Sequence, residues 1–267
     1  MRTSPWSTGR RSRRDEPECS AGGGAYPLRL RRGLRLCFYD RVESALGVEV
    51  IVVPLSKDGY SLTLGGHKII VLAATGHWFR SNFTLAHELG HLLVEGIPPQ
   101  DGKAAENVAN AFAADLLMPV EIIRTIDWAQ AEAATVARVV WDLGVSTQAL
   151  GVRLRFLGIA PGNKARSALG MSTEALLRGS PAPAVAPPAA VTARMEYSAR
   201  RRFPERVVTG LRRAVADGDA PQASLSWVLG LPAWEENNDD VTPESHELDI
   251  DLEGYSGCVL GHFREVI

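Results

Sequence analysis

The chain has 267 residues, of which 45% are hydrophobic and 22% are charged, and its net charge is −2. Such a composition predicts a globular protein with a core of its own, and it excludes binding to nucleic acid or membranes through overall charge. Three cysteines without CxxC spacing predict neither a disulfide framework nor a cysteine zinc site. The arginine-rich N-terminus lacks the apolar core of a secretory signal, and no apolar run approaches about 18 residues. We therefore expect a cytoplasmic protein that does not contact the membrane.

The N-terminal part of the chain predicts a helix, a small sheet and then several helices. Residues 1–25 are polar and rich in Gly and Arg, and we expect them to form a disordered basic tail. The strands, rich in Val and Ile, are expected at 48–55, 60–64 and 67–73. Helices are expected at 29–46, 82–95, 103–117, 131–142 and 146–157, with a short one beginning at Pro119. The connections between the strands are too short for crossovers, so we expect a small antiparallel sheet in an α+β fold.

The composition changes after residue 160, so we place the main domain at 26–160. The segment 161–199 contains "SPAPAVAPPAAVTA", which is typical of a Pro/Ala-rich linker. We expect a small helical segment at 200–233 and an acidic tail at 234–267.

The stretch "FTLAHELGHLLVEG" at 83–96 carries the strongest functional pattern. On a helix capped by Ser81 or Asn82, residues four apart project from one face, so His87 and His91 can reach one ion. Zinc binds imidazole nitrogen at about 2.0–2.1 Å. Glu88, beside the ligands, can take a proton from a water that the metal activates. The pattern therefore predicts a zinc site with its general base.

Two histidines leave the ligand set incomplete, and we expect a third ligand from another element. Glu106 lies early in the next predicted helix, which "PPQDG" allows to turn back toward the histidines. Asp115 is the competitor, and Glu95 is a weaker candidate because it lies far along the same helix. The longer pattern HExxHxxGxxH is absent, so we expect the third ligand to be an acid or a histidine from another element.

Two linked motifs resemble the ImmA/IrrE family of zinc metallo-endopeptidases. They are "RSNFTLAHELGHLL" at 80–93 and "ENVANAFAADLLMP" at 106–119, and the resemblance extends over roughly 30–160. It implies that His87, His91 and Glu106 bind zinc, that Glu88 is the general base, and that 26–160 is a zinc metallopeptidase domain. The oxyanion could be stabilised by Arg80, His77, Tyr60 or His67, among which the sequence does not choose.

The family resemblance also implies a partner, because members act on helix-turn-helix transcriptional repressors. The segment "ATVARVVWDLGVSTQALGVRLRFLGI" has the rhythm of a helix-turn-helix, but its second helix has few side chains suited to reading bases. We expect it to be a packed helical subdomain and do not expect direct DNA binding. The alternative is a non-proteolytic regulatory or toxin–antitoxin-type binding protein with a zinc site.

Overall fold

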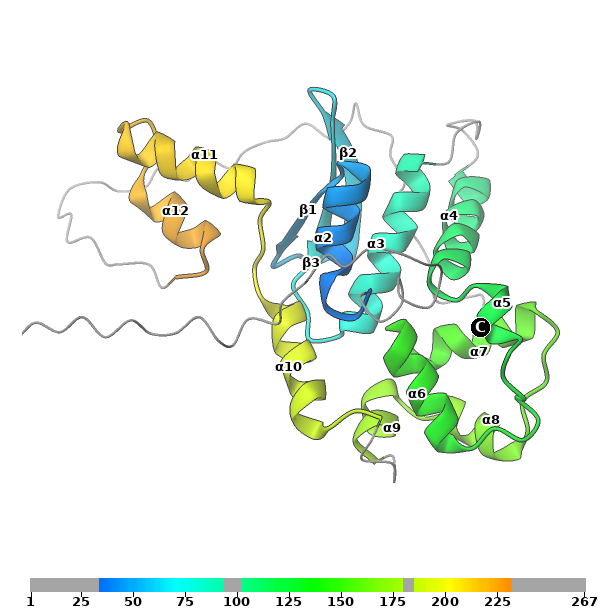
Figure 1. The fold of residues 1–267 in the computed structure, drawn as a ribbon. Coiled ribbons are helices and arrows are strands. Elements are labelled where there is room, and N and C mark those ends of the chain that lie inside the picture. The colour runs from blue at the N-terminus through cyan, green and yellow to red at the C-terminus, as the bar shows by residue number, and fades with distance from the viewer. Residues whose placement is uncertain (1–33, 94–101, 180–184, 232–267) are drawn as a thin grey trace, which may run out of the picture.

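The computed structural model describes residues 34–93, 102–179 and 185–231, and it has the expected α+β fold (Figure 1). The strands are β1 (Glu49–Val53), β2 (Gly59–Leu64) and β3 (His67–Ala73). The helices are α2 (Leu34–Leu46), α3 (Trp78–Leu93), α4 (Gly102–Leu117), α5 (Val120–Ile123), α6 (Ala133–Leu143), α7 (Thr147–Phe156), α8 (Asn163–Leu169), α9 (Thr173–Gly179), α10 (Pro188–Ala199), α11 (Glu205–Ala216) and α12 (Gln222–Val228). The tails expected at 1–25 and 234–267 lie outside the described residues.

The three strands form a mixed sheet in the order β1-β3-β2, so the prediction of an antiparallel sheet is only half correct. β2 and β3 form the expected antiparallel hairpin, whose turn places Gly65 and Gly66 at φ values of 55° and 84°. β1 pairs with β3 in parallel, with Val52 opposite Leu72. The short loops do not prevent this pairing, because β2 itself carries the chain back along the sheet before β3 enters between the other two strands.

Helix α3 lies at the centre of the described structure and packs against β2, β3 and α4. It begins at Trp78, four residues before the predicted start, so Ser81 and Asn82 lie inside the helix rather than at its cap. Both side chains contact other elements instead. Ser81 Oγ lies 3.2 Å from Ser198 Oγ, and Asn82 Nδ2 donates to the carbonyl oxygen of Gly144 at 3.0 Å. Polar residues that look like caps therefore join α3 to its neighbours.

The segment 161–199, expected to be a linker, is helical and packed over most of its described length. It forms α8, α9 and α10, of which α8 and α9 pack against α6 while α10 packs against α3 and α9. Its alanines permit this, since Ala165 and Ala168 are buried. Pro188 occupies the first turn of α10, where proline is favourable. The composition was misleading because alanine and proline are common in linkers, but alanine also packs well between helices and proline is also favourable at the start of a helix.

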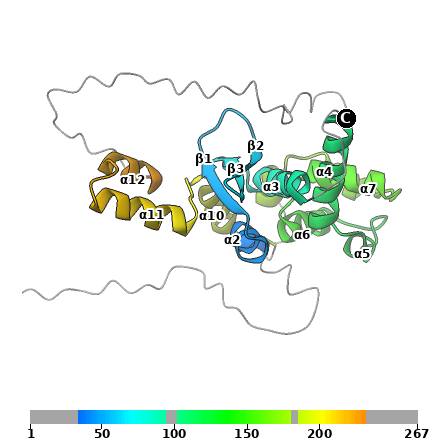
Figure 2. The ribbon, with the colours of Figure 1, turned by 90° about the horizontal axis from the view of Figure 1, so that it is seen from above.

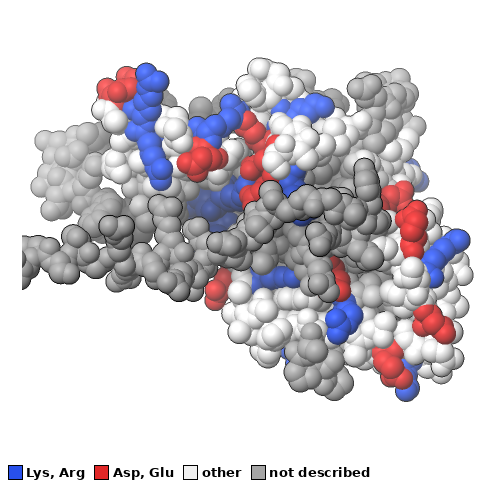
Figure 3. All heavy atoms as spheres, in the orientation of Figure 1, with Lys and Arg blue, Asp and Glu red and all other residues white. Residues whose placement is uncertain are grey.

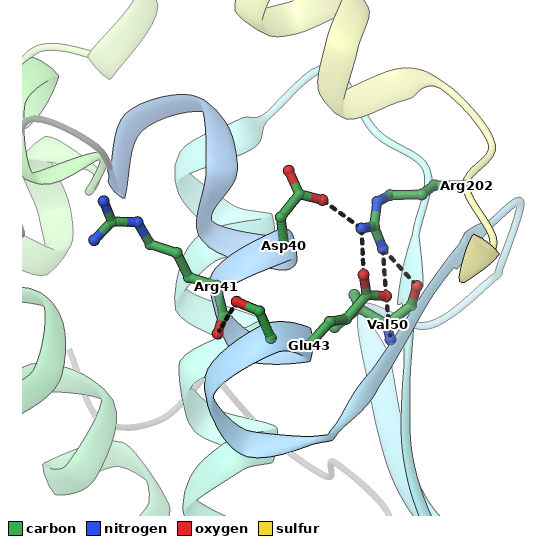
Figure 4. Close-up of polar contacts among 6 residues, drawn as sticks. Asp40, Arg41, Glu43, Val50 and Arg202 are labelled. Atoms are coloured by element: carbon green, nitrogen blue, oxygen red, sulfur yellow. Dashed lines mark hydrogen bonds and ion pairs between the residues drawn. The ribbon is translucent and has the colours of Figure 1, made fainter. Parts of the chain in front are cut away.

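The chain after α10 is attached to the free edge of β1 (Figure 4). Arg202 exchanges two backbone hydrogen bonds with Val52, at 2.8 and 2.9 Å. Its guanidinium group donates to Glu43 Oε1 at 2.8 Å, to Asp40 Oδ1 at 2.6 Å and to the carbonyl oxygen of Val50 at 2.9 Å. Arg202 thus ties this segment to both α2 and β1.

Helices α11 and α12 follow this attachment and pack against each other. In the views of Figures 1 and 2 they lie beyond β1, on the opposite side of the sheet from α4. They fall within the small helical segment expected at 200–233. No helix in the described residues is long and apolar enough to cross a membrane.

Candidate metal centre

Helix α3 brings the two histidines of the motif together on one face. His87 Nε2 and His91 Nε2 lie 3.0 Å apart, as the four-residue spacing predicts. His87 is buried, with 4% of its surface exposed, and His91 is half-buried at the edge of the site. The planes of the two rings are nearly perpendicular, at 81°, so the rings do not stack on each other.

Helix α4 supplies the third side chain, Glu106. Its Oε2 lies 3.3 Å from His87 Nε2, and its Oε1 lies 3.3 Å from His91 Nε2. The two helices approach closely because Gly90 has no side chain. A Cβ atom at that position would lie 2.9 Å from the Cα atom of Ala109, on α4. Gly90 therefore allows the backbone of α4 to approach α3 closely.

The geometry of this cluster fits a metal ion. In a tetrahedral zinc site with zinc–ligand distances of about 2.0–2.1 Å, neighbouring donor atoms lie about 3.3 Å apart. Here the two histidine nitrogens lie 3.0 Å apart, and each lies 3.3 Å from a different oxygen of the Glu106 carboxylate, so the three side chains could reach one ion. Glu106 Oε1 is buried without a hydrogen-bond partner, despite its approach to His91. A cation would satisfy that oxygen, and this is the one such ligand group found among the described residues.

Asn110 fixes the orientation and the tautomer of the His87 ring. His87 Nδ1 lies 3.0 Å from Asn110 Oδ1, so the Nδ1–H donates to the amide oxygen and leaves the Nε2 lone pair facing Glu106 and His91. Burial, followed by the nearby His91, lowers the pKa of His87 below its usual value. Both effects favour the neutral ring, which is the form that binds metals.

Glu88 is buried beside the cluster and is held by a strand. Only 4% of its surface is exposed, and Ser61 Oγ, on β2, donates to its Oε2 at 2.7 Å. Neither this role of Ser61 nor that of Asn110 was predicted from the sequence. Alternation along β2 could have placed Ser61 on the helix-facing side of the strand, but no local pattern indicates which helix residue it meets.

The other candidates from the sequence lie in different surroundings. Asp115 Oδ1 pairs with Arg153 Nη2 at 2.5 Å, and its side chain is 71% exposed, so it does not join the cluster. Glu95 lies outside the described residues. Arg80 Nη2 pairs with Asp58 Oδ2 at 2.5 Å. The carboxylate of Glu106, rather than that of Asp115, therefore meets the histidines.

The three remaining candidates for oxyanion stabilisation come from three different places. His77 directly precedes α3, and the centre of its ring lies 5.6 Å from that of Phe79, in the first turn of the helix. Tyr60 is exposed and alternates with Ser61 along β2, so its side chain leaves the opposite face of the strand. His67 is exposed at the start of β3. None of these positions identifies the residue that would stabilise the oxyanion.

Comparison with known families agrees with the site. The family model described as the IrrE N-terminal-like domain matches residues 43–155, a range that includes the three clustered side chains and Glu88. No curated protein matches the chain. Residues 43–155 therefore match an IrrE N-terminal-like domain, the metallopeptidase domain of the ImmA/IrrE family.

Proposed function

We propose that this protein is a zinc-dependent endopeptidase that hydrolyses a peptide bond in one specific protein. The substrate would be a helix-turn-helix transcriptional repressor, whose cleavage relieves repression of stress-response or mobile-element genes. One observation carries the enzymatic part of the proposal. His87, His91 and Glu106 each offer one donor atom within 4.8 Å of the others, close enough to hold one metal ion, and the carboxylate of Glu88 is buried beside them.

The proposed mechanism assigns a task to each residue of the site. His87, His91 and Glu106 would hold zinc, which would polarise the scissile carbonyl and acidify the attacking water. Glu88 takes a proton from that water and passes it to the leaving amine. Asn110 keeps the Nδ1 proton of His87 occupied, so that Nε2 stays available as a ligand. The metallopeptidase family and the His-His-Glu donor set both favour zinc as the metal.

Membership in a peptidase family implies a protein substrate, and the family resemblance supports a repressor as that substrate. We do not propose that the chain binds DNA itself. In α7, Thr147, Leu150 and Leu154 are buried, and Arg153 donates to the carbonyl oxygen of Met118 at 3.0 Å. The helix-turn-helix-like segment is thus packed within the fold.

The charges and the compartment are consistent with a protein substrate. On the face drawn in Figure 3, Lys and Arg side chains of the described residues alternate with Asp and Glu side chains rather than forming one basic field. A repressor acts in the cytoplasm, which is the compartment that the cysteine content predicts.

The first test compares the zinc-loaded protein with its Glu88→Gln variant. Each would be incubated with the purified helix-turn-helix protein encoded nearest to its gene and, separately, with a proteome-derived peptide library. We expect wild-type protein to produce defined fragments, and Glu88→Gln to bind zinc but lose at least about 100-fold in rate, because a general base contributes that much. Glu121→Gln, an exposed substitution of the same kind on α5, serves as the control and should cleave normally.

The outcomes separate the proposal from its alternative. Cleavage by Glu88→Gln at the wild-type rate would refute the assigned mechanism. Stable binding of the repressor by the zinc-loaded protein, with no fragments from either substrate, would instead favour a non-proteolytic regulatory protein of the toxin–antitoxin type. Cleavage of library peptides but not of the repressor would refute only the proposed substrate.

A further inference from the structure

Ser61 lies on β2, an edge strand of the sheet. In the order β1-β3-β2, strand β2 forms one edge and also packs against α3. The contact is close, because a Cβ atom on Gly59 would lie 2.8 Å from Thr84 Cγ2. Two residues along the strand, Ser61 meets Glu88, which lies one helical turn after Thr84. β2 therefore runs along the side of α3 that carries the general base.

The contact between Ser61 and Glu88 restricts the end of a flexible side chain. The last torsion of a glutamate is broad and roughly two-fold, so burial alone does not fix which carboxylate oxygen faces the site. Ser61 Oγ donates to Glu88 Oε2 at 2.7 Å, a normal distance for a hydrogen bond from a hydroxyl group to oxygen. One oxygen of the carboxylate is thereby occupied by the strand.

The position of Ser61 is itself fixed by the sheet. In the β2–β3 ladder Ser61 lies opposite Ile70, a fully buried residue in the central strand. A serine side chain has only one heavy-atom torsion, so the hydroxyl oxygen has only a few staggered positions once the backbone is fixed. The donor is therefore preorganised before any substrate arrives, which is what effective catalysis requires of a supporting group.

We propose that Ser61 is a positioning residue for the general base of this enzyme. Its hydroxyl holds Glu88 Oε2, so that Oε1 is the oxygen that takes the proton from water and returns it to the leaving amine. The inference rests on the proposed endopeptidase function and deepens it, because it places one residue of β2 in the catalytic arrangement. Ser61 acts through Glu88 and does not itself take part in the chemistry.

The test uses the full-length zinc-loaded protein and a fluorogenic peptide chosen from the library described above. Ser61→Ala should lower kcat by about 10- to 100-fold, the range found when residues that orient active-site groups are removed, and should leave KM and zinc content unchanged. Ser61→Thr keeps the hydroxyl and should retain most of the rate. Thr63→Ala removes a hydroxyl two residues along the same face of β2 and should cleave like the wild type.

Three results would overturn the proposal. The first is a wild-type kcat in Ser61→Ala. The second is an equal loss in Ser61→Ala and Ser61→Thr, which would indicate packing rather than a hydrogen bond. The third is a parallel loss of zinc, which would indicate damage to the metal site.

A second measurement does not depend on cleavage. Acetohydroxamic acid binds to zinc as the hydroxamate anion and gives its proton to an adjacent base, so its affinity reports the placement of Glu88. By calorimetric titration of the zinc-loaded proteins, both Glu88→Gln and Ser61→Ala should bind it about 10-fold more weakly than the wild type. This result, without any peptide cleavage by the wild type, would support Ser61 while refuting the proposed function. Equal affinity in Ser61→Ala and the wild type would refute the role of Ser61 alone.

Discussion

The close approach of α3 and α4 at Gly90 gives a quantitative prediction for the substitution Gly90→Ala. The new Cβ atom would lie 2.9 Å from Ala109 Cα and 3.3 Å from both Ala109 Cβ and its carbonyl oxygen. Carbon atoms in contact prefer at least about 3.5 Å, so α4 must withdraw by about 0.6 Å. Glu106 lies one turn before Ala109 on α4 and would move with it.

The expected consequence is weaker metal binding together with a limited loss of stability. Metal–ligand distances tolerate only about 0.2 Å, so a withdrawal of this size weakens the bond to Glu106, and we expect zinc affinity to fall at least about 10-fold. For the apo protein two effects oppose each other. Alanine stabilises a helix interior by about 1 kcal/mol relative to glycine, whereas overpacking costs about 1–3 kcal/mol. The free energy of unfolding should therefore decrease by no more than about 2 kcal/mol.

The assay is competition for zinc against a fluorescent chelator, combined with thermal unfolding of the apo protein. Gly151→Ala is the matched control, because Gly151 lies inside α7 with nothing within 4 Å of the position of a new Cβ. It should raise the free energy of unfolding by about 0.5–1 kcal/mol and leave zinc affinity unchanged. If Gly90→Ala behaves like Gly151→Ala in both measurements, the argument from close approach is wrong.

Two further substitutions test the metal centre by the same competition assay. Glu106→Ala removes a proposed ligand and should lower zinc affinity far more than Asp115→Ala, which removes only the partner of Arg153. Equal losses of affinity would make Asp115 a candidate ligand again. Asn110→Ala releases the His87 ring and should lower zinc affinity by about 10- to 100-fold, and an unchanged value would show that the hydrogen bond to Asn110 is dispensable.

The sequence predicted the elements of the fold better than their arrangement. Patterns of apolar residues located β1, β2 and β3 to within a few residues, because alternation is a local property of a strand. The parallel pairing of β1 with β3 depends on which strand enters the middle of the sheet, and no local pattern encodes that choice. Composition likewise misjudged 161–199, because burial of Ala165 depends on the neighbouring helix rather than on the segment itself.

The candidate site divides in the same way. His87, Glu88 and His91 could be predicted from the sequence because one helical turn brings them together within five residues. Glu106 required the motif of the following helix and the family resemblance. Ser61 and Asn110 meet their partners across 27 and 23 residues of sequence, and serine and asparagine are common at surfaces and turns. Ser61 lies in no motif, and the motif that contains Asn110 does not indicate its partner.

The structure further shows that the HExxH helix has a close neighbour on each of two sides of the candidate site. β2 approaches α3 where Gly59 meets Thr84, and α4 approaches it where Gly90 meets Ala109. These contacts bring a hydroxyl to Glu88 on one side and the carboxylate of Glu106 to the histidines on the other. In both cases the close approach of the two backbones is possible because the residue at the contact is a glycine, which has no side chain. The positions of the proposed base and of the proposed third ligand are therefore determined by how closely two backbones can approach one helix, and substitutions at these glycines should perturb the base and the metal site separately.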